Sequence, residues 1–159
     1  MDILSQQPSL RILRHPLFIA LIAWAVSSLH AIAADPTSSP TQLKVQIRGI
    51  RSNQGKVVIA LFESKKTFTK KAIQSASLTI KDRSASWTTK PLSPGNYAIA
   101  LYHDANENGK MDKNFFGIPK EDYGFSRDAK PSYGPPRWED AAFEVKSGPN
   151  FQTIVIQRK

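Results

Sequence analysis

Apolar and polar residues alternate strictly at the start of the region that follows residue 42. Residues 43–48 read LKVQIR, with an apolar side chain at every odd position. This period of two is typical of a β-strand that buries one face. Residues 57–62 form a nearly continuous apolar run, and the turn-forming sequence SNQG precedes it at 52–55. The pattern predicts that these two strands pair as a hairpin.

Five further short strands are predicted, at residues 77–80, 86–89, 97–102, 141–145 and 153–157. The Lys-rich residues 67–73 are expected to form a connecting loop or one helical turn. No segment is long enough to be the crossover helix of a parallel sheet. The sequence therefore predicts an all-β fold, an antiparallel β-sandwich of about seven strands.

The same pattern predicts which side chains face the core, because alternate residues of a strand lie on one face. We expect residues 43–103 and 141–157 to form one sandwich around these side chains. The predicted inward set includes Val45, Ile47, Ile59, Leu61, Ile99, Leu101, Phe143, Val145 and Ile156.

The first 33 residues have a different pattern. A basic stretch ending at His15 precedes an uncharged run at 17–29, and the sequence AIA follows at 31–33. These three features are typical of a cleaved secretory signal peptide. We expect cleavage after residue 33 or 34, export to the periplasm or the extracellular space, and no membrane span in the mature chain. The alternative is an uncleaved anchor helix, because residues 15–34 contain no Asp, Glu, Lys or Arg.

Residues 34–42 are rich in Pro, Ser and Thr and lack periodicity, which predicts a flexible tether. Residues 43–157 are expected to form a single β-sandwich domain with an inserted loop at 104–140. The chain contains no Cys. This excludes disulfide scaffolds, cysteine nucleophiles, thiolate zinc sites, iron–sulfur clusters and lipobox lipoproteins.

The chain is basic, with 22 Lys and Arg against 13 Asp and Glu. Removal of residues 1–33 takes away Arg11, Arg14 and Asp2 and leaves a net charge of +8. Export argues against nucleic acid as a partner. We expect an anionic lipid, an envelope polymer or another envelope protein, bound with the help of charge and more weakly at high salt. The alternative is that dispersed lysines only keep a small protein soluble.

Residues 104–140 form a 37-residue segment without periodicity, far longer than an ordinary connection. Disordered segments are poor in aromatic residues, so we expect an ordered loop packed by its own side chains over the sandwich. The alternative is that Tyr123, Phe125, Tyr133 and Trp138 form an exposed platform for sugar rings or a partner protein. The segment holds six of the fifteen aromatic residues of the chain, namely Phe115, Phe116, Tyr123, Phe125, Tyr133 and Trp138.

Oxygen-bearing side chains recur at alternate positions at the start of this segment. Asp104, Asn106 and Asn108 occupy positions 1, 3 and 5 of the sequence DANENGKMD, and a glycine follows at position 6. This spacing gathers oxygens around a hard cation such as Ca²⁺. Lys110 would add its backbone carbonyl, and Asp112 would add a carboxylate from position 9. We expect at least one further ligand from Glu121, Asp122, Glu139 or Asp140.

The pattern differs from an EF-hand, because position 12 is Phe115 and no helices flank the loop. The alternative is a strand-ending turn, in which Asp and Asn side chains bond the nearby backbone without a metal. Transition metals are disfavoured, because oxygen donors dominate and only His103 adds a nitrogen.

Catalysis is the competing hypothesis, in the form of a small envelope enzyme that acts on a glycan or an ester. An esterase would pair His103, the only histidine after residue 33, with a serine such as Ser126. A glycan hydrolase would use carboxylates of the loop. Glu121/Asp122 and Glu139/Asp140 are adjacent pairs, and each supplies at most one group to a common pocket. We therefore favour a non-catalytic module with a binding or structural role.

Four stretches of the chain carry a resemblance to a known family. They are LKVQIRGIRSNQGKVVIALF at 43–62, PGNYAIALYHD at 94–104, NENGKMDKNFFGIPKEDYG at 106–124 and GPPRWEDAAF at 134–143. In this order they resemble the DUF2141 family of exported bacterial proteins. The resemblance implies a small β-sandwich related to transthyretin-like or immunoglobulin-like modules. It implies no particular activity.

Overall fold

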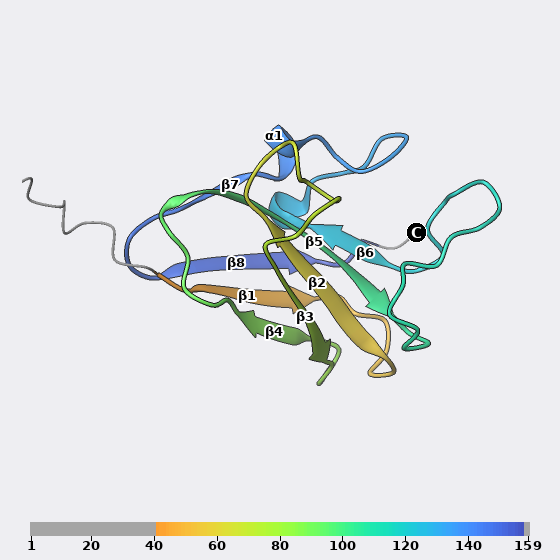
Figure 1. The fold of residues 1–159 in the computed structure, drawn as a ribbon. Coiled ribbons are helices and arrows are strands. Elements are labelled where there is room, and N and C mark those ends of the chain that lie inside the picture. Colours follow the sequence, from red (N-terminus) through yellow and green to blue (C-terminus); the bar gives the residue numbers. More distant parts are fainter. Residues whose placement is uncertain (1–40, 158–159) are drawn as a thin grey trace, which may run out of the picture. The chain divides into compact units, whose positions relative to one another are not determined.

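The computed structural model describes residues 41–157, and the predictions for residues 1–40 lie outside this part of the chain. Within it, eight strands form two sheets that pack face to face (Figure 1). The predicted β-sandwich is confirmed, with eight strands in place of about seven. None of the helices in residues 41–157 is long and apolar enough to cross a membrane.

The smaller sheet has three strands in the order β4-β1-β8. Its central strand is β1 (Leu43–Arg48), which pairs antiparallel with β4 (Ala85–Thr88). On its other edge β1 pairs in parallel with β8 (Asn150–Val155). The predicted antiparallel arrangement therefore has one exception, the pair formed by the first and last strands.

The larger sheet has five strands, in the order β3-β2-β5-β6 with β7 also paired to β5. They are β3 (Gln74–Thr79), β2 (Lys56–Phe62), β5 (Gly95–Asp104), β6 (Tyr123–Phe125) and β7 (Phe143–Val145). The long strand β5 accommodates two short neighbours, because β6 pairs with residues 100–102 and β7 with residues 95–97. The turn η1 (Ser126–Asp128) and the short helix α1 (Trp138–Ala141) lie between β6 and β7 in the sequence.

Ser126 completes the hydrogen bonding of β5 where β6 ends. The N–H of Ile99 donates to Ser126 Oγ (2.9 Å), and Ser126 Oγ donates to the carbonyl of Ala141 (2.6 Å). The serine is fully buried. Buried backbone groups need hydrogen-bond partners. Between the part of β5 that pairs with β6 and the part that pairs with β7, the Ser126 hydroxyl therefore replaces a backbone hydrogen bond of the sheet.

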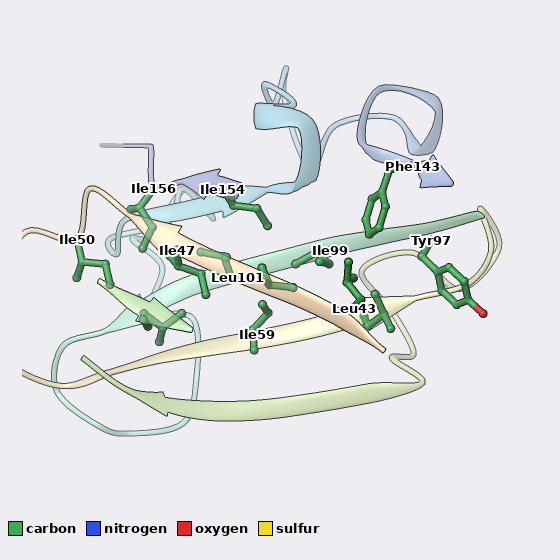
Figure 2. Close-up of a cluster of buried hydrophobic side chains, with 14 of the residues drawn as sticks. Leu43, Ile47, Ile50, Ile59, Tyr97, Ile99, Leu101, Phe143, Ile154 and Ile156 are labelled. Carbon is green, nitrogen blue, oxygen red and sulfur yellow. The ribbon is translucent and has the colours of Figure 1, made fainter. Parts of the chain in front are cut away.

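The main core lies between the two sheets. All nine residues of the predicted inward set are buried, so this prediction is confirmed. Figure 2 shows side chains of both sheets in one cluster, including Ile47 of β1, Ile59 of β2, Ile99 of β5 and Ile154 of β8. The alternation on β1 buries one face of that strand, as the sequence predicts.

The larger sheet also buries its outer face. The small side chains of Ala60 and Ala98 leave room there for Phe68 and Trp138, whose ring centroids lie 5.7 Å apart. Phe68 belongs to the turn-rich segment after β2, where a loop or single helical turn is predicted. Burial on both faces explains why residues 57–62 read as a nearly continuous apolar run.

The predicted hairpin between residues 43–48 and 57–62 is wrong. β1 pairs with β4 and β8, whereas β2 pairs with β3 and β5. Residues 49–55 therefore carry the chain from one sheet to the other. The apolar pattern identifies the buried face of a strand, but it does not specify the neighbouring strand.

Two boundaries also differ from the prediction. Thr41, placed in the flexible tether, exchanges two backbone hydrogen bonds with Leu92 (2.8 and 2.7 Å). The segment 104–140, expected to lack regular structure, contains β6, η1 and α1. β6 has only three residues, which is too short for a period of two to appear in the sequence.

Candidate functional site

The chain between β5 and β6 extends beyond the end of the sandwich (Figure 1). Asp104 is the last residue of β5 and pairs with Lys56 of β2. Residues 105–122, here called the β5–β6 loop, follow it before the chain re-enters the sheet. A salt bridge of 3.0 Å between Lys56 Nζ and Glu107 Oε2 ties the start of this loop to β2.

The buried carboxylate of Asp104 organises the start of the β5–β6 loop. Its Oδ1 accepts the N–H of Asn108 (3.1 Å), and its Oδ2 accepts the N–H of Gly109 (2.8 Å). Asn106 Oδ1 also accepts the N–H of Asn108 (3.3 Å), and Asn108 Oδ1 accepts that of Lys110 (2.8 Å). Such bonds from Asp and Asn side chains to the nearby backbone fix the turn.

Asp112 links this turn to the far end of the loop. Its carboxylate accepts the side-chain amide of Asn106 (2.9 Å) and that of Asn108 (3.1 and 3.2 Å). Its N–H donates to Glu121 Oε2 (3.1 Å). The structure thus brings together four side chains predicted from the spacing and one of the four additional candidates.

Glu121 is a buried carboxyl group, only 8% exposed. Burial raises its pKa above the ordinary value, the hydrogen bond from the Asp112 N–H opposes this shift, and the nearby carboxylates of Asp104 and Asp112 add to it. A cation would relieve the repulsion among these carboxylates. In residues 41–157, no three His, Cys, Asp or Glu side chains form a metal centre by themselves. A cation here would therefore also need amide and carbonyl oxygens.

The remaining predicted ligands bind cationic side chains instead. Asp122 pairs with Arg51, Glu139 with Lys65, and Asp140 with Arg137. Glu139 and Asp140 belong to α1. The hydrogen bonds from Lys65 and Arg137 lower the pKa of these two carboxyls. Neither of them joins the group around Asp112.

A turn at the far end of the β5–β6 loop displays apolar side chains. Phe115 is 98% exposed, Phe116 82% and Ile118 57%. The two phenylalanine rings contact each other edge to face, with centroids 5.5 Å apart. We call residues 113–119 the tip. The patterns considered above do not predict its exposure, although two adjacent phenylalanines followed by glycine are a usable signal.

Hydrogen bonds hold the tip in one shape. Asn114 Oδ1 accepts the N–H groups of Phe116 and Ile118, both at 3.0 Å. The carbonyl of Asn114 accepts the N–H of Gly117 (2.9 Å), and its own N–H donates to the Ile118 carbonyl (2.8 Å). Gly117 adopts a φ of 77°, which favours glycine. The phenylalanines therefore extend from an ordered turn.

The six aromatic residues of segment 104–140 do not share one environment. Phe125 is buried and Tyr123 and Trp138 are half-buried in the cluster outside the larger sheet. Phe115, Phe116 and Tyr133 are exposed. The prediction that the segment is packed by its own side chains does not hold for these three. The alternative platform of Tyr123, Phe125, Tyr133 and Trp138 does not form either, because Phe125 is buried in that cluster.

The two side chains considered for acyl transfer have structural partners. His103 is 5% exposed, and its Nε2 lies 2.7 Å from the carbonyl of Gln54. A carbonyl can only accept, so Nε2 donates in this bond. Ser126 is occupied with Ile99 and Ala141, as described above. His103 and Ser126 are therefore not exposed together in one site.

Comparison with known proteins agrees with the motifs. The family described as "uncharacterized protein conserved in bacteria" (DUF2141) matches residues 45–153, which include most of β1, the β5–β6 loop and most of β8. The chain has no match among curated proteins or among solved structures. The family match covers more than half of the chain, and the protein belongs to the DUF2141 family.

Proposed function

We propose that this protein is an exported, non-catalytic β-sandwich module of the cell envelope that binds a partner through the tip. One observation carries the proposal: Phe115 and Phe116 are almost fully exposed on a turn that the chain holds rigidly. Contiguous apolar patches on the surface of soluble proteins often mark binding sites, whereas apolar side chains exposed singly do not. A module that only needed to be soluble would gain from polar residues here.

The placement of the polar side chains supports a non-catalytic role. The bonds of His103 to Gln54 and of Ser126 to Ile99 and Ala141 stabilise the fold. In the alternative, a glycan- or ester-cleaving enzyme, these groups would have to leave their partners. The loop carboxylates of Asp104 and Asp112 likewise bond the turn that contains them.

Replacing Phe115 and Phe116 together by serine is expected to release the protein from the envelope fraction of the cells that export it, while its folding is unchanged. The measurement is cell fractionation, with the N-terminus of the recovered protein determined by mass spectrometry. Tyr133→Ser is the matched control, because Tyr133 is fully exposed on a different loop. Equal retention of the double variant and the wild type would contradict a binding role of the tip, and an intact Met1 would contradict signal cleavage.

We also propose that Ca²⁺ orders the base of the β5–β6 loop. Oxygens of Asp104, Asn106, Asn108, Asp112 and Glu121 support this, and each would give up a hydrogen bond within the loop to the cation. The pKa of Glu121, which burial raises and the nearby carboxylates raise further, also supports it. The donors are hard oxygens, which fit Ca²⁺. The Lys110 carbonyl is the further donor that the spacing supplies. With few carboxylates, the affinity belongs in the weak extracellular range, roughly 10⁻⁴–10⁻³ M.

Ca²⁺ is expected to raise the melting temperature of the wild type, whereas Asp112→Asn should abolish the increase. At about ten times the dissociation constant, binding to the native state adds about 1.4 kcal/mol. This corresponds to a rise of a few degrees. The measurement is calorimetry with Ca²⁺ and with a chelator at equal ionic strength, together with limited proteolysis of the loop.

Asp82→Asn is the control for the calcium experiment, since it removes one carboxylate from the exposed turn between β3 and β4. It should keep the full response to Ca²⁺. If millimolar Ca²⁺ gives no heat, no protection of the loop and no change in melting temperature, the residues from Asp104 to Asp112 form only a hydrogen-bonded turn.

A further inference from the structure

We infer that the partner of the tip is the surface of an anionic phospholipid membrane, into which Phe115 and Phe116 insert. This inference rests on the proposed binding role of the tip and adds the chemistry of the partner. Three properties of the tip lead to it: the small size of its apolar surface, the lysines that flank it in the sequence, and the hydrogen bonding of its backbone.

The apolar surface of the tip is small compared with a stable protein interface. Phe115, Phe116 and Ile118 are the exposed apolar side chains there. An aromatic side chain buries roughly 150–250 Å², so these three side chains would reach the roughly 800 Å² that each partner of a stable protein complex contributes only together with flanking polar residues. A lipid surface sets no such minimum, because a few apolar side chains can enter it while the rest of the protein stays in water.

Lysines flank the apolar side chains along the chain. Lys110, Lys113 and Lys120 are exposed, and none of them forms an ion pair with another residue of 41–157. Asp112 is the only acidic residue from 110 to 120, and its carboxylate already accepts the amides of two asparagines. The positive charges are thus free to approach lipid phosphates, and the net charge of +8 that remains after removal of residues 1–33 adds to the attraction.

The backbone of the tip is suited to an apolar medium. An N–H group that loses water without gaining another partner opposes insertion into lipid. Here the N–H groups of Phe116, Gly117 and Ile118 all donate to Asn114. At the base of the tip, the N–H of Lys120 donates to the carbonyl of Asp112 (2.7 Å). The turn can therefore enter the membrane interface and keep these hydrogen bonds, because none of them is made with water.

The test is sedimentation of the exported protein with vesicles of phosphatidylcholine alone and of equal parts phosphatidylcholine and phosphatidylglycerol. The wild type should bind the anionic vesicles at least about tenfold more strongly. Raising the salt from about 0.1 M to about 1 M should remove this preference. All variants carry the same N-terminus as the wild type, so differences among them report on the substituted residues.

Substitutions separate the two contributions of the tip. Phe115→Ser with Phe116→Ser should weaken binding to anionic vesicles at least about tenfold, whereas Tyr133→Ser should not. Lys113→Glu with Lys120→Glu should remove the preference for anionic lipid. Lys70→Glu with Lys71→Glu makes the same change of charge on exposed residues of another segment and should leave most of the preference.

A fluorescent reporter tests insertion directly. Brominated phosphatidylglycerol should quench the fluorescence of F116W more than that of a Tyr133→Trp variant. Both variants keep the native Trp87 and Trp138, so the difference reports on the introduced tryptophan, and only that at position 116 enters the acyl region. Equal quenching of the two variants, or equal binding of the wild type to neutral and anionic vesicles, overturns the inference.

The remaining outcomes distinguish this inference from the proposed function. Suppose that the double serine variant leaves the envelope fraction but the wild type binds neither kind of vesicle. In that case the inference of a lipid partner is wrong, and the proposal that the tip binds a partner stands. Dimerisation that disappears in the same variant would assign the tip to a second copy of the chain and also overturn the lipid partner. If the variant stays in the envelope fraction and the wild type ignores vesicles, both proposals fall.

Discussion

Replacing Ile99 by alanine is expected to lower the free energy of unfolding by roughly 2–5 kcal/mol. Ile99 lies in the middle of β5, is fully buried, and packs in the cluster between the two sheets (Figure 2). Alanine would remove three carbons from this cluster, and the surrounding strands can close the resulting cavity only in part. The measurement is equilibrium unfolding in denaturant, with the slope compared between wild type and variant.

Ile118→Ala makes the same chemical change at an exposed position and serves as the control. Its expected cost is under about 0.5 kcal/mol, as for most surface substitutions. If Ile99→Ala costs no more than Ile118→Ala, then Ile99 does not face the core.

Replacing Gly55 by alanine is expected to destabilise the protein by roughly 3 kcal/mol or more. Gly55 precedes β2 and has a φ of +76°, a conformation that L-residues rarely adopt. An added Cβ would lie 2.1 Å from the carbonyl oxygen of Asp104 and 2.6 Å from the Cα of Ala105. These are backbone atoms at the start of the β5–β6 loop, so relief of the contact requires the end of β5 to move.

Gly148→Ala separates steric contact from conformational strain. Gly148 has a φ of +98°, but no atom lies within 4 Å of an added Cβ. This variant should lose only about 1–2 kcal/mol, the cost of the unfavourable backbone conformation. Equal losses for the two glycines, measured by denaturant unfolding, would show that the contact with Asp104 is not a constraint.

The sequence predicts which face of each strand is buried better than it predicts which strands pair with each other. Ile47 and Ile59 were both assigned correctly to the core, because alternation depends only on which side of a strand is buried. The hairpin between their strands was wrong, because the same alternation fits any partner strand. The parallel pairing of β1 with β8 depends on residues distant in the sequence, and no local pattern reports it.

The part of the candidate site that lies within one turn of the chain could be predicted from the sequence. The spacing from Asp104 to Asp112 places these side chains in one turn, and the structure has this turn. The contact of Glu121 with Asp112 was one of four alternatives, because it depends on how the loop closes. The tip was missed for a physical reason: aromatic residues are expected to be buried, and only the fold reveals that Phe115 and Phe116 are not.

The pairing of β1 with β8 sets the order in which the protein can fold. Leu43 pairs with Asn150, so one edge of β1 stays open until the end of the chain is available. Pairings between such distant residues place folding in the range of milliseconds to seconds. An open edge invites pairing with other chains during this time. The outward side chains of Lys44 and Arg48 place charge along β1 and oppose such association.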